Sequence, residues 1–237
     1  GGVNVGKNYV HWLDLHIKLT GKTVVRSLLR SFALSYRLSG GKNPVILAYE
    51  LQKSFRDRAE TWILEHRLKA GDNKLRPYYE ERIKKAKKSI SIVSPYFLPG
   101  RWLLRALRAA MHRGVRVEIL LPKETSPAIL GIPNLFYAAA FSELGAHFYF
   151  SRVMNHGKAL LVDDEEGLIG SQNIDAQSFD FNAEVGVSFT KKKMVSELRA
   201  IIEEWKRGAE EFTHDTFKKR WYHKPLEFLS RILQPIM

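Results

Sequence analysis

Apolar and polar positions follow two different periods along the second half of the chain. Residues 89–94 alternate between apolar and polar side chains, as in a half-buried strand. Residues 101–113 carry an apolar stripe at helical spacing with arginines on the other side, and Gly114 marks the end of this helix. The same reasoning predicts further elements: strands over 115–121, 147–151, 158–163, 167–170 and 183–189, and helices over 134–144 and 192–212. Strands that alternate with helices predict an α/β fold with a mixed or parallel sheet flanked by helices.

The pattern is less regular before residue 78 and after residue 212. Residues 38–44 have the composition of a linker, and Gly71-Asp72-Asn73 indicates a turn. Residues 221–237 predict an amphipathic helix with Pro225 in its first turn. These observations predict four segments: residues 1–40, a linker region over 41–77, the α/β unit over 78–212 and a C-terminal amphipathic tail over 213–237.

The composition narrows the possible partners and chemistry. The 237 residues carry a formal net charge of +13, which favours polyanionic partners, either nucleic acid or an anionic membrane surface. Cysteine is absent, which excludes disulfides, thiolate catalysis and cysteine-based metal sites. The first residues do not have the pattern of a signal peptide, and the apolar run over 128–141 is too short to cross a bilayer. We therefore expect no membrane-spanning segment in this sequence.

One constellation in the α/β unit carries chemistry, with the pattern HxKxxxxDxxxxxxGSxN. Its fixed positions are His156, Lys158, Asp163, Gly170, Ser171 and Asn173. At ordinary residue frequencies, six fixed positions match by chance about once in 10⁷ to 10⁸ starts. The pattern is therefore far more specific than a lone glycine motif.

The residue types suit the cleavage or transfer of a phosphodiester. His156 and Lys158 are two apart on a predicted strand, so their side chains leave the same face. Imidazole can act as a nucleophile or a general acid near neutral pH, and an ammonium group and amides can stabilise charge on phosphate oxygens. We therefore assign His156 and Lys158 as catalytic, and Lys158, Ser171 and Asn173 as phosphate-binding. Asp163 is expected on the opposite face, with a structural role.

The pattern resembles the HKD motif of the phospholipase D superfamily. Residues 94–100 (SPYFLPG), the helix that follows them, residues 113–117 (RGVRV) and Asn182-Ala183-Glu184 are similar to bacterial cardiolipin synthases. The resemblance implies a phospholipase D-like fold and a phosphohistidine intermediate, with no metal or cofactor. It also implies that a downstream acidic residue orients the catalytic histidine, and Glu184 fits that place. Gly170 is expected to be structural.

The mechanism implied by the resemblance needs two HxK motifs, and this sequence contains one. His16 is followed by Lys18, but the remaining motif positions are missing there. Residues 1–4 (GGVN) instead look like the end of a first motif, in which Asn4 would bind phosphate. Asp14 follows Asn4 by ten residues, much as Glu184 follows Asn173 by eleven. We therefore expect residues 1–40 to be the trailing part of a first half, with Asp14 structural there, and residues 78–212 to be the second half.

Three functions remain open. The leading interpretation is phosphatidyl transfer between two phosphatidylglycerol molecules, which yields cardiolipin, by a protein bound to the cytoplasmic surface of a bacterial cell membrane. A first rival is a phosphodiesterase, nuclease or phospholipase D hydrolase in which two copies of the chain each supply one motif. A second rival is an inactive fragment that only binds anionic lipid or nucleic acid. Nucleic acid is an expected partner only under these alternatives. The tail, in turn, is either a docked helix or an interfacial membrane anchor.

Overall fold

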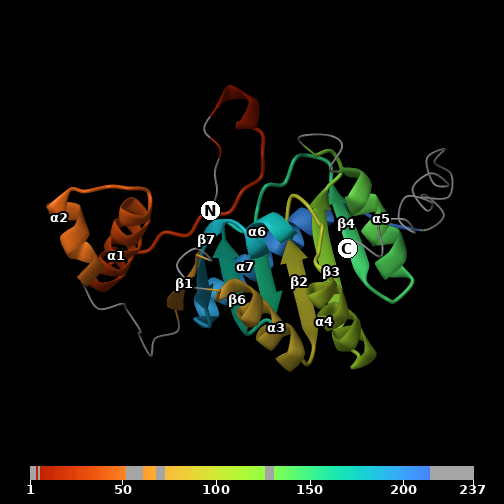
Figure 1. Cartoon of the computed structure of the whole chain (residues 1–237). Coiled ribbons are helices and arrows are strands. Elements are labelled where there is room, and N and C mark those ends of the chain that lie inside the picture. Colours follow the sequence, from red (N-terminus) through yellow and green to blue (C-terminus); the bar gives the residue numbers. More distant parts are fainter. Residues whose placement is uncertain (1–3, 5, 52–60, 68–72, 126–130, 214–237) are drawn as a thin grey trace.

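The computed structural model describes residues 4, 6–51, 61–67, 73–125 and 131–213. Their strands form one eight-stranded mixed sheet in the order β1-β7-β6-β5-β2-β3-β4-β8 (Figure 1). The strands are β1 (Thr61–Arg67), β2 (Ser89–Val93), β3 (Arg116–Pro122), β4 (His147–Ser151), β5 (Ala159–Val162), β6 (Glu166–Gly170), β7 (Ala183–Phe189) and β8 (Ala209–Glu211). The helices are η1 (Lys7–Tyr9), α1 (Lys22–Leu38), α2 (Pro44–Leu47), η2 (Ala48–Leu51), α3 (Leu75–Lys85), α4 (Arg101–His112), α5 (Gly131–Ser142), α6 (Ala176–Asp180) and α7 (Lys192–Arg207). The expected α/β fold with a mixed sheet is confirmed.

The centre of the sheet is parallel. β2, β3 and β4 run in the same direction, and α4 and α5 make the two crossover connections between them. α4 buries Leu103 and Leu107 completely against the sheet, whereas Arg101 and Arg105 remain exposed. The amphipathic pattern of this helix therefore decides which of its sides meets the strands.

The strands β5, β6 and β7 form an antiparallel meander beside β2. The turn from β5 to β6 places Asp163 and Asp164 at positive φ, a conformation that aspartate tolerates better than most residues. The Asp163 carboxylate accepts hydrogen bonds from the backbone N–H groups of Lys87, Lys88 and Ser89, at distances of 2.7–3.1 Å. These bonds tie the turn to the start of β2.

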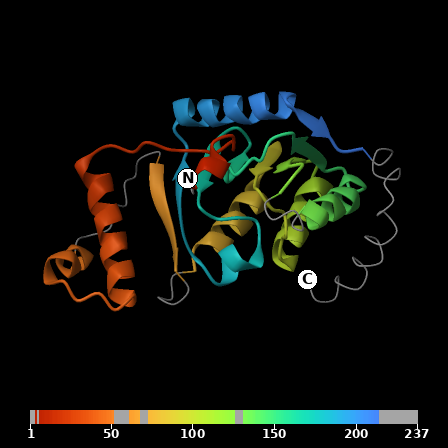
Figure 2. The same cartoon turned by 90° about the horizontal axis from the view of Figure 1, so that it is seen from above.

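Helices cover both faces of the sheet, as Figure 2 shows. α3, α4, α5 and α6 lie on one face, over a core that includes Ile90, Leu103 and Phe148. α7 lies on the other face, where it packs with residues 15–19 over a smaller core that includes Leu161 and Ile202. The helices on the two faces of the sheet bury most apolar side chains of the strands, as is usual for a mixed sheet in an α/β fold.

The structure departs from the sequence-based reading at both edges of the sheet. Residues 61–67, expected to belong to a linker, instead form β1, which pairs antiparallel with β7 from Thr61↔Phe189 to Arg67↔Ala183. The helix expected over 192–212 ends at Arg207, and β8 follows Gly208 to pair with β4. The boundaries at residues 40 and 78 stay predictions.

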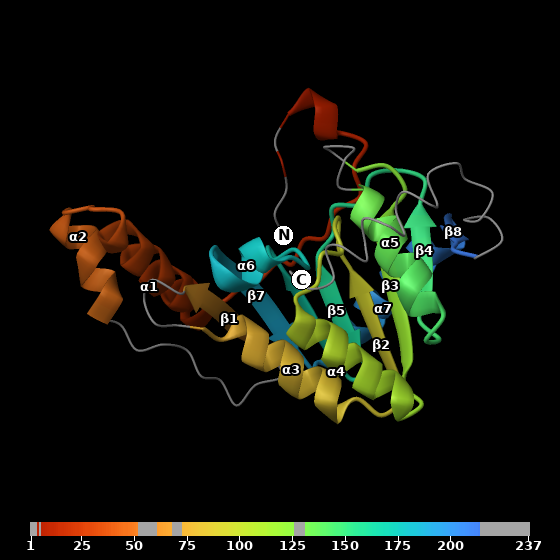
Figure 3. The ribbon, with the colours of Figure 1, turned by 45° about the vertical axis from the view of Figure 1, so that its right-hand side comes forward.

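Buried polar side chains explain why β1 is hard to recognise. Arg67 is only 7% exposed, because its guanidinium pairs with Glu65 at 2.7 Å and with the Ser31 hydroxyl and the Ser35 hydroxyl of α1. In the sequence these charged residues resemble solvated positions, since charged residues are seldom buried unless they are paired. The same contacts hold α1 against the outer side of β1, beyond the edge of the sheet (Figure 3).

The C-terminal tail predicted over 213–237 lies outside the described residues, apart from Thr213. Among the helices that the structure describes, none has both the length and the apolar character needed to cross a bilayer.

Candidate active site

The segment 155–158 leads into β5 at the edge of the sheet where β2 and β6 end. Gly157 is favoured there because a Cβ atom would make tight contacts with Asn155 Oδ1 at 3.0 Å and with the Trp205 ring of α7 at 3.1 Å. The buried Asn155 side chain also accepts the Gly157 N–H at 2.9 Å. The glycine between His156 and Lys158 thus lets this segment pack closely on α7.

The N-terminal segment docks beside His156. Leu13 and Asn155 form a parallel bridge, in which the His156 N–H donates to the Leu13 carbonyl at 2.7 Å. The Trp12 ring lies near the imidazole, with 5.3 Å between the ring centroids. The segment before α1 therefore forms one wall of the site, although it is more than 140 residues away in sequence.

Asp14 is the hydrogen-bond partner of the imidazole. Its Oδ2 lies 3.1 Å from His156 Nδ1, and both side chains are 13% exposed. Burial alone would raise the pKa of Asp14, but hydrogen bonds from His156 and the Leu15 N–H outweigh this effect and lower the pKa. Because a carboxylate can only accept, the proton lies on Nδ1 and the lone pair on Nε2. This is the tautomer that a nucleophile or general base requires.

The assignment of Glu184 as the partner of His156 is wrong. Glu184 accepts hydrogen bonds from the Ser171 hydroxyl and from Asn182 Nδ2, the latter at 3.3 Å, and Asp14 fills the position on His156. The physical reason is the path of the chain, which returns the N-terminal segment to His156, while Glu184 on β7 is held by Ser171 and Asn182. Asp14, expected to be structural, therefore contacts the imidazole directly.

The charges of both carboxylates act on Lys158. Its side chain is nearly buried, at 4% exposure, and its Nζ lies 2.9 Å from His156 Nε2 and 2.7 Å from the His156 carbonyl oxygen. Burial lowers the pKa of Lys158 to about 8, although the charges of Asp14, Glu184 and Asp175 act in the opposite direction. The ammonium group thus lies beside the imidazole nitrogen that carries the lone pair.

The predicted phosphate-binding residues occupy different positions. The Asn173 N–H donates to the Ser178 hydroxyl at 3.0 Å, and Asn173 Oδ1 is buried without a hydrogen-bond partner among the described residues. The Ser171 hydroxyl donates to Glu184 and accepts from the Val185 N–H, so a phosphate contact would require it to exchange a bond. Asn4 is exposed, and no hydrogen bond joins it to the described site residues. The phosphate-binding roles stay predictions.

The other motif residues lie in the scaffold. Asp163 is at the far end of β5, where it binds the three backbone N–H groups described above. At Gly170 a Cβ atom would lie 2.0 Å from Gln172 Oε1 and 2.9 Å from the Val185 carbonyl oxygen, so the close approach of these groups excludes a side chain. Gln172 in turn donates to the Tyr79 hydroxyl at 3.1 Å.

Three residues near the site were missed by sequence reasoning. Asp175 caps α6 by accepting the Ser178 N–H at 2.7 Å, and its charge reaches Lys158. The fully buried His66 of β1 lies opposite Glu184 in the register, with its Nδ1 at 3.5 Å from the Leu75 N–H. Tyr96 lines the approach to Asn173. Only Asp175 carried a local signal, an aspartate three residues before a serine at a helix start.

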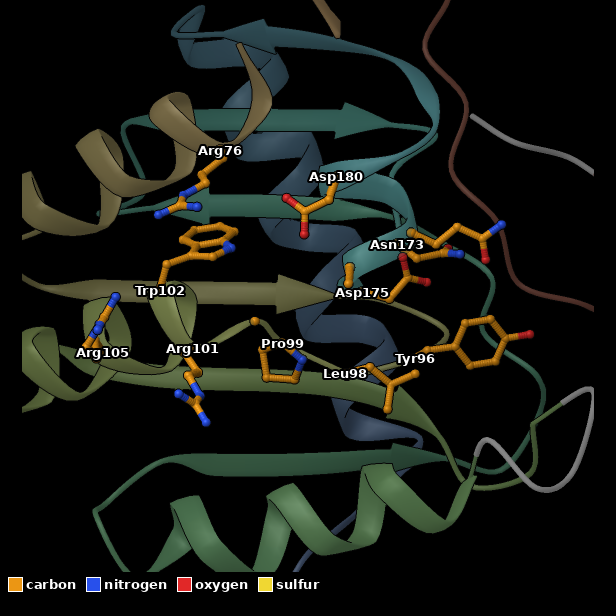
Figure 4. A pocket seen from close by; sticks show the side chains of 13 residues that line it. Arg76, Tyr96, Leu98, Pro99, Arg101, Trp102, Arg105, Asn173, Asp175 and Asp180 are labelled. Carbon is orange, nitrogen blue, oxygen red and sulfur yellow. The ribbon is translucent and has the colours of Figure 1, made fainter. Parts of the chain in front are cut away.

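A groove of about 840 Å³ adjoins these residues (Figure 4). Asn173 and Tyr96 lie at one end of it, and Arg76, Trp102 and Arg105 lie at the other. Within the part of the chain that the structure describes, no three histidine or carboxylate side chains converge as metal ligands would. The geometry therefore offers an imidazole, an ammonium group and carboxylates for acid–base and nucleophilic chemistry.

Comparison with known protein families places this arrangement in context. A family model described as the phospholipase D-like domain of cardiolipin synthase matches residues 79–206. A cardiolipin synthase of Listeria welshimeri is 30% identical over 249 aligned positions, covering 100% of this chain and 51% of that protein. The minor cardiolipin synthase of Bacillus subtilis is 28% identical and covers 98% of this chain and 59% of that protein. The chain spans about half the length of the curated relatives it matches.

Solved structures are similar in fold. The phosphatidylserine synthase of Haemophilus influenzae aligns with a TM-score of 0.68 at 17% identity, over 92% of this chain and 60% of that one. Nuc, a phospholipase D family member from Salmonella typhimurium, aligns with a TM-score of 0.53 at 19% identity, over 64% of this chain and 97% of that one.

Proposed function

This chain belongs to the cardiolipin synthase family with a phospholipase D-like domain, and from that premise we propose that it supplies one half-site of a phosphatidyltransferase. The observation that carries the proposal is the line of contacts from Asp14 through His156 to Lys158, at 3.1 and 2.9 Å. A carboxylate that fixes the imidazole tautomer and a cation beside its free nitrogen are what phosphoryl transfer through a histidine needs.

The chemistry follows from the positions of the protons. His156 Nε2 carries the lone pair, so it can attack phosphorus to form a phosphohistidine, or accept a proton from an attacking hydroxyl. Lys158 Nζ, 2.9 Å from that nitrogen, can turn to a non-bridging phosphate oxygen as negative charge develops. The Asn173 amide, at the end of the groove, can donate a second hydrogen bond to the same phosphate.

A second histidine is required to protonate the leaving alcohol. Asp14 follows Asn4 at nearly the same spacing as Glu184 follows Asn173, so the two carboxylates have equivalent positions in the sequence pattern. Asp14 shares a hydrogen bond with His156, which is a histidine of the other half. By the same exchange, Glu184 would orient a histidine from the first half. Glu184 is only 8% exposed, and its charge, like that of Asp14, acts on Lys158, which supports this assignment.

We assign phosphatidylglycerol as donor and acceptor, with cardiolipin and glycerol as products, at the cytoplasmic surface of a bacterial membrane. The names of the curated relatives and the net charge of +13 support an anionic lipid surface as the partner. Apolar side chains on segments that flank the site support it as well, because Val10 and Phe181 are 72% and 74% exposed.

A homodimeric phosphodiesterase with one motif per chain is the second candidate. The contact between Asp14 and His156 disfavours it, because this contact already joins the trailing end of one half to the histidine of another. Such an enzyme would place two copies of His156 on one phosphate.

The test uses the full-length protein and vesicles that contain labelled phosphatidylglycerol. We expect cardiolipin to form, and His156→Ala to lower its formation by at least about 10⁴-fold, because nucleophile and base act as a unit. Asp164→Ala is the matched control, since this exposed residue lies at the far end of β5. Cleavage of DNA without any turnover of lipid would contradict the proposal.

A further inference from the structure

The groove beside Asn173 leads away from the catalytic residues and is not used by the chemistry described above. Its walls come from the loop after β2, from the first turns of α3 and α4, and from α6 (Figure 4). Asn173 and Asp175 line its inner end, and the charge of Asp175 also reaches Lys158. A ligand in the groove would therefore meet the phosphate site at one end.

The two sides of the groove differ in charge. Arg76, Arg101 and Arg105 come from α3 and α4, whereas Asp175 and Asp180 come from α6. The Arg76 guanidinium lies over the Trp102 ring, 5.4 Å from its centroid, and its Nε donates to Glu80 at 2.9 Å. Such a site can hold a phosphate on its arginine side, since guanidinium groups bind phosphate in a bidentate manner.

The positive side extends beyond the groove. Arg105 also lines an adjoining hollow of about 460 Å³, together with Lys84 and Arg113. The groove itself, at about 840 Å³, lies within the size range of roughly 300–1,000 Å³ that small-molecule sites occupy. It is large enough for a glycerol phosphate group, and its carboxylates can accept hydrogen bonds from glycerol hydroxyls.

We infer that this groove binds the lipid that accepts the phosphatidyl group, with the lipid's phosphate on the arginine side and its glycerol hydroxyls towards Asp175. The inference rests on the proposed function, because only a transfer between two phospholipids needs a second phosphate site. The acceptor brings its own phosphodiester, which the residues around His156 cannot hold while the first phosphate occupies them. A water molecule or a simple alcohol would need no such site.

The transfer step then balances. The primary hydroxyl oxygen of the acceptor forms a bond to phosphorus, and the bond between phosphorus and the histidine nitrogen breaks, with its electron pair returning to the imidazole. The hydroxyl proton passes to the histidine of the other half. The acceptor phosphate stays on the arginines and is unchanged by the reaction.

A partition experiment on the full-length protein isolates acceptor binding. Vesicles of labelled phosphatidylglycerol supply both donor and lipid acceptor, and ethanol is added as a competing acceptor without charge. Both products arise from the same phosphatidyl-enzyme, so the ratio of cardiolipin to phosphatidylethanol reports only the acceptor. We expect Arg105→Gln to lower this ratio about tenfold, the effect of losing one charged hydrogen bond.

Arg108→Gln is the matched control, because Arg108 lies on the same helix, carries the same charge and is exposed, but does not line the groove. Its ratio should stay within about twofold of the unmodified protein. Arg101→Gln on the same wall provides a second variant if Arg105→Gln fails to fold. An unchanged ratio in both groove variants, or an equal fall in Arg108→Gln, would overturn the inference. Persistence of both products in His156→Ala would instead overturn the proposed function.

Discussion

The segments 4–14 and 173–184 share a sequence pattern, but the carboxylates at their ends have different hydrogen-bond partners. Each starts with an asparagine and reaches a carboxylate ten or eleven residues later. In the first, Asp14 ends 3.1 Å from the imidazole of His156, which belongs to the other half of the sequence pattern. In the second, the Glu184 carboxylate is held by Ser171 and Asn182, and no histidine side chain of the described residues donates to it.

The difference indicates how the two half-sites depend on each other. A carboxylate that orients a histidine need not belong to the motif that contains the histidine. If the exchange is mutual, each half is incomplete until the other is docked against it, and the two motifs form one site. The following variants of the full-length protein test whether Asp14 and Glu184 have equivalent roles.

Asp14→Asn should have the largest effect. An amide can present its N–H₂ group to Nδ1 and so favour the wrong imidazole tautomer, which we expect to lower transfer about 10²–10⁴-fold. The tautomer of His156 is read directly from the ¹⁵N chemical shifts of its ring nitrogens. A normal Nδ1–H tautomer together with lost activity would show that Asp14 acts in some other way.

Glu184→Gln should lower transfer by a smaller factor, about 10–100-fold, as expected for a residue that acts through a partner. The ring nitrogen shifts of His156 should not change, because Asp14 remains in place. We expect the shifts of a second histidine to change instead. If the shifts of His156 respond to Glu184→Gln and not to Asp14→Asn, the assignment of the two carboxylates is reversed.

The pH dependence of kcat/KM should respond to both carboxylates, because both act on the pKa of Lys158. The value of kcat/KM should fall as the pH rises through about 8, the pKa of Lys158, because the neutral amine cannot stabilise phosphate charge. Asp14 and Glu184 both raise this pKa, and Asp14 contributes more. Asp14→Asn should therefore move the basic limb to lower pH further than Glu184→Gln does.

The titration of Lys158 should also make the free energy of unfolding depend on pH. This effect can be measured without an activity assay. The folded protein releases the Lys158 proton near pH 8, whereas an unfolded lysine keeps it to about 10.5. Between these values the unfolded chain binds more protons, so the free energy of unfolding gains a contribution that increases with pH. Lys158→Met should remove that slope, measured as the difference between the two proteins. Parallel curves across this range would contradict the lowered pKa.

Asp163→Ala should have the smallest effect on activity and a measurable effect on stability. It removes three hydrogen bonds from backbone N–H groups to a carboxylate, which we expect to cost about 1–3 kcal/mol. Asp164→Ala is a matched control, because the two residues have φ values of 57° and 56° and share the cost of alanine in that conformation. Chemical denaturation gives the difference. A loss of transfer in Asp163→Ala without a change in stability would assign it to the chemistry.

Much of the fold was predictable because local patterns decide it. The strands over 147–151 and 183–189 were placed to the residue, and those predicted over 89–94, 115–121, 158–163 and 167–170 to within one residue at either end. β1 was not recognisable, since its buried Arg67 and His66 look like surface positions until their partners on α1 and α3 are known. Residues 209–211 continue a helical pattern in the sequence, but in the structure they pair with the edge of β4 as a strand.

The sequence by itself determined the motif, its spacing and the side chains available for chemistry at His156 and Lys158. Only the tertiary structure decided that Asp14, and not Glu184, contacts His156, and that arginines of α3 and α4 line the groove that begins at Asn173. The physical reason is distance along the chain. Spacing within a strand or helix fixes which side chains share a face, but contacts between residues 142 apart depend on how the whole sheet is assembled.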